Sequence, residues 1–195
     1  MNLGKIIGKG TERICYENLD NPETCLKISD KNNCVQTIRE IRYFKFLAKK
    51  GIHPSFLPKF YRSFETPDKI GFEQEYLKST NEFQAVSLKT YIRESDFYQL
   101  QQVEQSLNEI KALMIQFNVI ISDLRTGNTL LLVNKQRKIL RIIFIDGFGS
   151  PEFIPLPIYC PFFGKLKIER QWKKFMKKYN EEKNSRIREL NTSQS

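Results

Sequence analysis

The chain has 195 residues, 40% hydrophobic and 28% charged, which suffices for one compact domain or two small lobes but not for a large multidomain enzyme. Lys and Arg number 32 against 22 Asp and Glu, for a formal net charge of +10, so an anionic partner is the first expectation. The opening segment has no long apolar stretch, and no later one reaches the roughly 18 apolar residues of a membrane span. We therefore expect a cytoplasmic protein.

The cysteines exclude a zinc site of the Cys/His type. They form no Cys-x-x-Cys pair, and the only histidine, His53, lies in a Gly-Ile-His-Pro turn. Cys15 and Cys25 flank an expected hairpin and could face each other, but without a secretory signal we expect two reduced, half-buried strand residues. Neither a structural zinc nor a catalytic Cys–His pair is expected.

The first third of the chain alternates strand-like runs and turns. One stretch of helical spacing interrupts the alternation, so the pattern predicts a mixed antiparallel sheet with one helix. In chain order the elements are strands at 4–7, 13–17 and 24–28, a helix at 35–50, and strands at 56–64 and 70–77.

The rest of the chain is mostly helical. An apolar stripe predicts a long helix from Leu100 to Phe117, and two apolar runs at 128–134 and 139–145 predict a hairpin. The proline-rich stretch after Gly149 is not expected to form regular helix, and a basic helix follows it. The expected division is an N-lobe at 1–77, a shortened C-lobe at 78–180 and a flexible polar tail at 181–195.

The most informative stretch spaces polar side chains in a way that suits phosphoryl transfer. Asp123 and Asn128 show Asp-x-x-x-x-Asn spacing, Arg125 lies between them, and Asp146 begins Asp-Gly-Phe-Gly. Transfer from ATP needs a carboxylate to orient the acceptor hydroxyl, an amide oxygen and a second carboxylate on Mg²⁺, and cations for the phosphates. We expect Asp123 and Arg125 to be catalytic and Asn128 and Asp146 to bind magnesium. The alternative is that these are ordinary turn residues.

Two upstream residues suit the same chemistry. Lys27 lies on an expected strand whose neighbours Leu26 and Ile28 point to the opposite face, so its side chain is expected to reach the nucleotide. Glu40 lies in line with the apolar stripe of the following helix, and a pairing with Lys27 explains that position. The alternative for Glu40 is a boundary position with its carboxylate in solvent.

The other expected nucleotide contacts are positional. Gly8 and Gly10 begin the turn between the first two strands, where glycine lets the backbone approach phosphates, although a plain hairpin turn explains them almost equally well. Arg13 replaces the third glycine of Gly-x-Gly-x-x-Gly, so the loop either offers less backbone access or gains a side-chain cation. Glu75 and Leu77 end the last predicted strand in the first third of the chain.

The order of these residues resembles that of the protein-kinase-like superfamily. This resemblance implies that Glu75 and Leu77, at the end of the last strand, hold the adenine of ATP. More closely, the chain resembles the PhoP regulatory network YrbL family, small bacterial kinase-like proteins. The resemblance implies an α+β, protein-kinase-like two-lobe fold with a mixed antiparallel N-lobe sheet plus one helix and a shortened, mostly helical C-lobe, and a link to bacterial signalling. It rests on Gly10-Thr11-Glu12-Arg13, Cys15-Tyr16, Cys25-Leu26-Lys27-Ile28, Arg39-Glu40, Ile154-Pro155-Leu156 and the run from Glu169 to Phe175.

The chain also departs from protein kinases. Ile121 and Ser122 replace the His-Arg that normally precedes the catalytic loop, Gly147 is an extra glycine, and no Ala-Pro-Glu follows. Protein substrates are therefore less secure than phosphoryl transfer itself. We expect an ATP- and Mg²⁺-dependent phosphotransferase whose acceptor is a protein or a small molecule; the alternative is a nucleotide-binding pseudokinase that acts as a regulatory scaffold.

Most of the excess positive charge lies near the C-terminus. From Lys165 onward there are ten Lys and Arg against four Glu, and an apolar face opposes the lysine-rich one. This helix either docks on the C-lobe or binds an anionic membrane or a protein partner, and nucleic acid ranks last. The apolar face consists of Ile168, Trp172, Phe175, Met176 and Tyr179.

Overall fold

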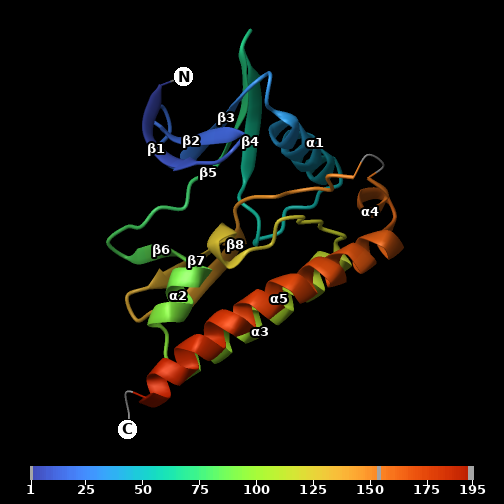
Figure 1. Ribbon diagram of the computed structural model, residues 1–195. Helices are drawn as coiled ribbons and strands as arrows, with labels where there is room; N and C mark the ends of the chain where they lie inside the picture. The colour runs from blue at the N-terminus through green and yellow to red at the C-terminus, as the bar shows by residue number, and fades with distance from the viewer. Residues whose placement is uncertain (1, 153–154, 193–195) are drawn as a thin grey trace. The chain divides into compact units, whose positions relative to one another are not determined.

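The computed structural model describes residues 2–152 and 155–192 (Figure 1). The chain forms two compact units: unit 1 comprises Met1–His53 and Leu57–Leu77, and unit 2 comprises Pro54–Phe56 and Lys78–Ser195. Both combine helices with antiparallel sheet, so the predicted α+β class is confirmed.

Unit 1 is a five-stranded sheet with one helix, in the strand order β1-β2-β3-β5-β4 and with every neighbouring pair antiparallel. The predicted strand at 56–64 starts only at Phe60, since Phe56 and Leu57 are buried in a turn and Pro58 lacks an N–H. The elements are β1 (Leu3–Lys9), β2 (Arg13–Asn18), β3 (Thr24–Asp30), α1 (Val35–Lys49), β4 (Phe60–Glu65) and β5 (Lys69–Glu75).

Helix α1 packs its apolar stripe on this sheet. Ile41, Phe44 and Leu47 are buried, and the Phe44 ring lies 5.2 Å from the ring of Phe60 and 6.0 Å from that of Phe72, centroid to centroid. These are distances at which aromatic pairs attract beyond simple burial. The stripe and the sheet together form the apolar core of unit 1.

Unit 2 contains a three-stranded antiparallel sheet, β6-β7-β8, and the remaining helices. The predicted long helix and hairpin are confirmed, whereas β6 and α2 were missed because each is short and one directly follows the other. The elements are β6 (Phe83–Ser87), α2 (Leu88–Glu94), α3 (Phe97–Gln116), the 3₁₀ turn η1 (Thr126–Asn128), β7 (Thr129–Asn134), β8 (Ile139–Phe144), α4 (Leu156–Tyr159) and α5 (Pro161–Thr192).

The proline-rich stretch is more helical than predicted. Pro157 lies in the first turn of α4, and Pro161 is the first residue of α5. Proline is tolerated in the first turn because its missing N–H has no intrahelical acceptor there. The expectation of no regular helix was therefore wrong for 156–159.

Helix α5 runs along α3 in unit 2 (Figure 1). Its Trp172, Phe175 and Tyr179 are buried, as are Leu100 and Leu107 of the predicted α3 stripe. Of the alternatives for the basic helix, docking within the C-terminal part of the chain is what the structure shows. Helix α5 has 32 residues, but neither it nor any other helix within 2–152 and 155–192 contains an apolar stretch that could span a bilayer.

The segment expected as a flexible tail continues α5 as far as Thr192, while 193–195 lie outside the described residues. Arg186 Nε donates to the carbonyl oxygen of Ser95 at 3.1 Å, and Lys183 forms an ion pair with Glu104. The prediction of a flexible tail was wrong for 181–192. Its polar composition suggested no packing, but polar contacts to residues distant in sequence hold this part of the helix.

These contacts predict that Arg186→Ala destabilises the protein. The Ser95 carbonyl loses its charged donor, which should lower the free energy of unfolding by about 1 kcal/mol. The exposed Arg188→Ala on the same helix serves as control and should change it by less than about 0.5 kcal/mol. Urea denaturation measures both; equal effects of the two substitutions would contradict the described packing of this segment.

Candidate functional site

In unit 1, the predicted phosphate-binding lysine lies on the side of the sheet that faces α1. The Ser29 and Thr37 hydroxyl oxygens are 2.6 Å apart, which places Ser29 against α1. Because side chains alternate along a strand, Lys27 shares that side with Ser29. Lys27 is buried, as is Glu40 on α1.

Glu40 is bound by the guanidinium of Arg13, a partner that the sequence did not indicate. Arg13 Nη2 donates to Glu40 Oε1 at 2.9 Å, and Arg13 Nη1 lies 2.9 Å from Oε2. Both side chains are buried. The Arg13 replacement in the Gly-x-Gly-x-x-Gly pattern thus places a guanidinium on α1, which is a use that sequence reasoning had not considered.

Three charges act on one another in this cluster. Burial and then the positive charge of Arg13 lower the pKa of Lys27, and the carboxylate of Glu40 opposes them. The Phe72 ring lies below both cations, 5.8 Å from Lys27 Nζ and 5.8 Å from the Arg13 guanidinium carbon, within cation–π range.

The turn between β1 and β2 is tied to the start of α1 by Glu12. Its two carboxylate oxygens each accept a backbone N–H, from Gln36 and Thr37, both at 2.7 Å. Such a contact satisfies donors that a helix N-terminus cannot pair internally and complements its positive end. Sequence reasoning missed Glu12, since a capping residue more than 20 positions away leaves no local signal.

Packing does not explain the glycines of this turn. A side chain at Gly8 would meet nothing within 4 Å, and one at Gly10 would meet only the Arg13 carbonyl oxygen at an ordinary 3.5 Å. Neither has a positive φ angle. A plain hairpin turn therefore does not require glycine at either position.

The two expected adenine contacts lie at the end of unit 1. The Glu75 N–H donates to the Lys59 carbonyl at 2.8 Å, and its carbonyl accepts from Cys25 Sγ at 3.8 Å. Leu77 is the last residue of the unit. The backbone groups of Glu75 are thus engaged within the sheet.

Cys15 lies opposite Lys27 in the β2–β3 register. A hydrogen bond from Cys25, together with the positive charges of Lys27 and Arg13, lowers the pKa of Cys15 to about 7 against the opposing effect of burial. Both thiols are free, with Cys15 half-buried and Cys25 buried. Cys15 is half-buried as expected, whereas Cys25 is buried rather than half-buried. Cys15 gains thiolate character from the Cys25 hydrogen bond and from the cations Lys27 and Arg13.

In unit 2, the predicted polar residues gather around Asp123. Asn128 Nδ2 donates to Asp123 Oδ2 at 3.1 Å, and Arg125 Nε lies 2.5 Å from Oδ1. The η1 turn brings Asn128 back towards Asp123, and the Thr129 hydroxyl holds the turn by donating to the Arg125 carbonyl at 2.8 Å. The predicted Asp, Arg and Asn thus meet in one place.

Asp146 reaches the same group through backbone contacts. The Ile145 N–H donates to the Asn128 carbonyl at 3.0 Å, and the Ser122 N–H donates to the Gly147 carbonyl at 2.7 Å. Gly147 has φ +80°, and a Cβ there would lie 2.5 Å from Asp123 Cβ. The extra glycine of Asp-Gly-Phe-Gly is therefore required for the close approach of the two loops.

Hydroxyl and backbone contacts hold the loop that carries Asp123 against the segment that follows Asp146. The Ser122 hydroxyl donates to the Gly149 carbonyl, Ile121 and Phe148 form an isolated antiparallel bridge, and the Gly149 N–H donates to the Ile120 carbonyl at 3.0 Å. The sequence showed Ile121 and Ser122 only as a departure from the kinase pattern, and these contacts were not predicted.

The oxygen atoms of Asn128 and Asp146 fit magnesium by type. The Asn128 amide nitrogen is directed at Asp123, so its Oδ1 is the atom it would offer a cation, and Asp146 adds a carboxylate. Over 2–152 and 155–192, no three or more His, Cys, Asp or Glu side chains are grouped to hold a metal. A carboxylate and an amide are a smaller set, of the kind that holds Mg²⁺ together with phosphate oxygens and water.

Gly147→Ala is expected to destabilise unit 2. The added methyl would overlap Asp123 in a backbone conformation unfavourable for alanine, at a cost of about 1–3 kcal/mol. Gly127→Ala is the matched control because a Cβ there meets nothing within 4 Å. Chemical denaturation of both variants tests the contact, and an unchanged stability of the Gly147 variant would show that the loops do not approach as described.

Cys15 is expected to react with iodoacetamide at lower pH than the thiol of free glutathione measured alongside it. Its thiolate fraction should rise through about pH 7, whereas that of an ordinary thiol rises near pH 8.5. Cys25→Ala and Lys27→Met should each move the midpoint upwards, since each removes a group that lowers the pKa. Mass spectrometry of the labelled peptides gives the midpoints. A Cys15 midpoint equal to that of glutathione would refute the electrostatic account.

Comparison with known proteins places the chain in a family. The model of the family described as PhoP regulatory network protein YrbL matches residues 2–180. The "Uncharacterized protein YrbL" of Escherichia coli (strain K12) is 21% identical over 178 residues, covering 87% of this chain and 82% of that protein. The protein of the same name from Shigella flexneri matches with the same identity and coverage. The chain therefore belongs to the PhoP regulatory network protein YrbL family, as its sequence predicted.

Proposed function

We propose that the chain is a kinase-like phosphotransferase that uses ATP and Mg²⁺. The observation that carries the proposal is the meeting of Asp123, Asn128 and the Asp146-Gly147 turn in unit 2. These residues lie far enough apart in sequence that a hairpin must fold back to join them. An amide beside one carboxylate, with a second carboxylate on the adjoining turn, suits Mg²⁺-dependent phosphoryl transfer.

The proposed roles in unit 2 follow from exposure and contacts. The side chain of Asp123 is 36% exposed, so its carboxylate is accessible to orient an acceptor hydroxyl. Arg125 is 72% exposed and can leave its ion pair to meet a phosphate. Asn128 and Asp146 would hold magnesium. The acceptor, a protein or a small molecule, is the part of the reaction that these residues do not specify.

In unit 1, the proposed role of Lys27 is to bind the phosphates, with Glu40 holding the lysine in place. The turn at Gly8 and Gly10 would approach the phosphates with its backbone, because neither glycine is needed for packing. Leu77 remains the proposed adenine contact, while Glu75 is engaged in the sheet. On this reading the fold is of the kinase-like two-lobe type with a shortened C-terminal part. The description of the family, a PhoP regulatory network protein, supports a role in bacterial signalling, which we place in the cytoplasm.

A pseudokinase scaffold is the second candidate. Arg13 contacts both oxygens of Glu40, and the pKa of Lys27 is lowered by burial and by Arg13. A lysine that is less readily charged and a glutamate already paired both weaken a phosphate-binding role. This candidate predicts weak or absent nucleotide binding.

A thermal-shift titration with Mg-ATP tests the proposal. Ligand that binds only the folded state adds about 2.7 kcal/mol of stability at 100 times its dissociation constant, so the melting temperature should rise. Lys27→Ala and Asp146→Ala should lose the rise, and Asp123→Ala should keep it while abolishing phosphate transfer. The exposed Lys5→Ala and Glu109→Ala are matched controls that should behave like the wild type.

The outcomes separate the two candidates. A magnesium-dependent rise that both site variants lose supports a working nucleotide site. No rise in the wild type, or a rise that survives both substitutions, would contradict the phosphotransferase and favour the scaffold. Melting each variant without ligand shows first that it folds.

A further inference from the structure

Helix α5 has one buried face, and the face on the opposite side of its axis is exposed. At 100° per residue, the buried Ile168, Trp172 and Phe175 lie within one narrow arc of the helix. Phe162 and Leu166 lie on the other side of the axis and are 66% and 51% exposed. Large apolar side chains on the outer face of a helix that already has a buried face are not explained by the core.

This outer face changes character along the helix. Phe162, Phe163 and Leu166 occupy its first turns, and Arg170, Lys173, Lys174 and Lys177 continue the same 120° arc. All seven are exposed. We call these seven residues the α5 outer face. From Pro161 to Tyr179 the exposed charged residues are six cations and a single acid, Glu169.

Helix α4 adds to the apolar end of this face. Tyr159 is 65% exposed and Leu156 is 49% exposed. The corner between α4 and α5 is fixed by Asn118, whose amide donates to the carbonyls of Pro157 and Ile158 at 2.9 and 3.1 Å. A Cβ at Gly164 would lie 1.7 Å from Asn118 Oδ1. The exposed apolar side chains are therefore carried by a braced corner.

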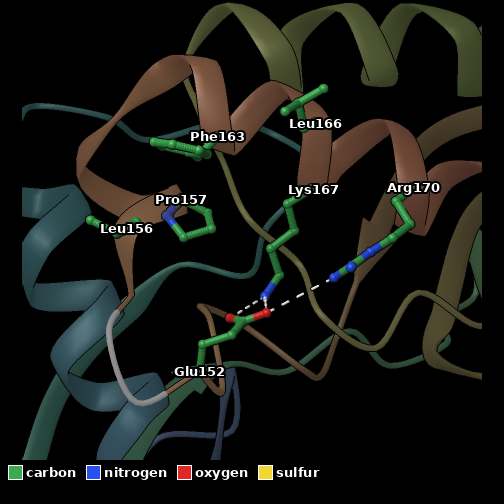
Figure 2. Close-up of a pocket in the computed structure, with 7 residues that line it drawn as sticks. All are labelled: Glu152, Leu156, Pro157, Phe163, Leu166, Lys167 and Arg170. Carbon is green, nitrogen blue, oxygen red and sulfur yellow. Dashed lines mark hydrogen bonds and ion pairs between the residues drawn. The ribbon is translucent and has the colours of Figure 1, made fainter.

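The polar residues beneath this corner belong to the fold. Lys167 is buried and bonds Glu152 and, at 2.9 Å, the Ser150 hydroxyl. Figure 2 shows the Lys167 ammonium and the Arg170 guanidinium directed at the Glu152 carboxylate, with Phe163 and Leu156 nearby. The Arg170 contact is long, 4.0 Å, and its side chain is 63% exposed. Arg170 is thus available to an outside anion, whereas Lys167 is not.

We propose that the α5 outer face and α4 bind the surface of an anionic lipid membrane. Exposed aromatic and aliphatic side chains would enter the boundary between headgroups and acyl chains, and the cationic turns would lie on the anionic headgroups. The face is the convex side of one helix, which suits a planar surface better than a peptide that needs a groove. Nucleic acid would use the cations but leave Phe162 and Leu166 without a role. The proposal is independent of the phosphotransferase activity.

Vesicle sedimentation with the full chain tests this proposal. Phosphatidylcholine vesicles that contain phosphatidylserine should bind the protein, and phosphatidylcholine alone should not. Lys173→Glu with Lys177→Glu should weaken binding more than 20-fold, since each cation near an anionic surface contributes about fivefold. Phe162→Ser with Phe163→Ser should weaken binding without changing its salt dependence.

The control variant carries the same charge change elsewhere. Lys135→Glu with Lys138→Glu lies at the exposed β7–β8 turn and should retain most of the binding. Melting curves should match the wild type for all three double variants, because each altered side chain is exposed.

Two results would overturn the proposal. One is absence of binding to phosphatidylserine vesicles, which would direct attention to an acidic protein partner. The other is that the control variant and the α5 charge variant weaken vesicle binding equally. Binding would then depend on the net charge of the protein and not on the α5 outer face.

Discussion

The arrangement of unit 1 depends on one buried carboxylate. Glu40 is completely buried on α1, yet it is contacted by the Arg13 guanidinium through both oxygens and its charge acts on the Lys27 ammonium. A buried charge is tolerated only when partners replace the water it loses. Because Arg13 comes from β2 and Lys27 from β3, this carboxylate joins two strands and a helix. Without it, two cations would be buried together.

In unit 2, backbone contacts rather than buried charges hold the separate segments together. The loop that carries Asp123 and the turn that carries Asp146 approach so closely that only glycine fits at Gly147. The backbone hydrogen bonds on either side fix the register of the two loops. The carboxylates and the amide of Asn128 are exposed to different extents, but their positions all follow from this approach. The chemistry we propose for unit 2 is therefore set by a steric constraint.

Much of this could be predicted from local patterns. The apolar period of α3 and the two runs of the β7–β8 hairpin are local signals, and both were predicted near their true bounds. The spacing from Asp123 to Asn128 was also visible, because a short turn returns the chain to its starting point. Family membership was recognised from short sequence motifs spread along the chain.

Several of the missed contacts share a cause, which is that long-range contacts leave no local pattern. Glu12 caps α1 from a distant turn, and Arg186 reaches the carbonyl of Ser95 some 90 residues away. The pairing of Arg13 with Glu40 belongs to the same class, since nothing near Arg13 in sequence indicates a helix partner. Gly147 looked like an irregularity in a motif until its distance from Asp123 gave the reason.

Lys27 is buried beside Arg13 and Glu40, and we propose that it binds a phosphate. Titration of the Lys27 side-chain amine by NMR, with and without Mg-ATP, tests it most directly. We predict a pKa below that of an ordinary lysine in the free protein, because burial and Arg13 disfavour the charge. Bound phosphates should raise it, since a nearby anion favours the charged amine. A lysine with an ordinary pKa, or one that Mg-ATP does not change, would contradict the account.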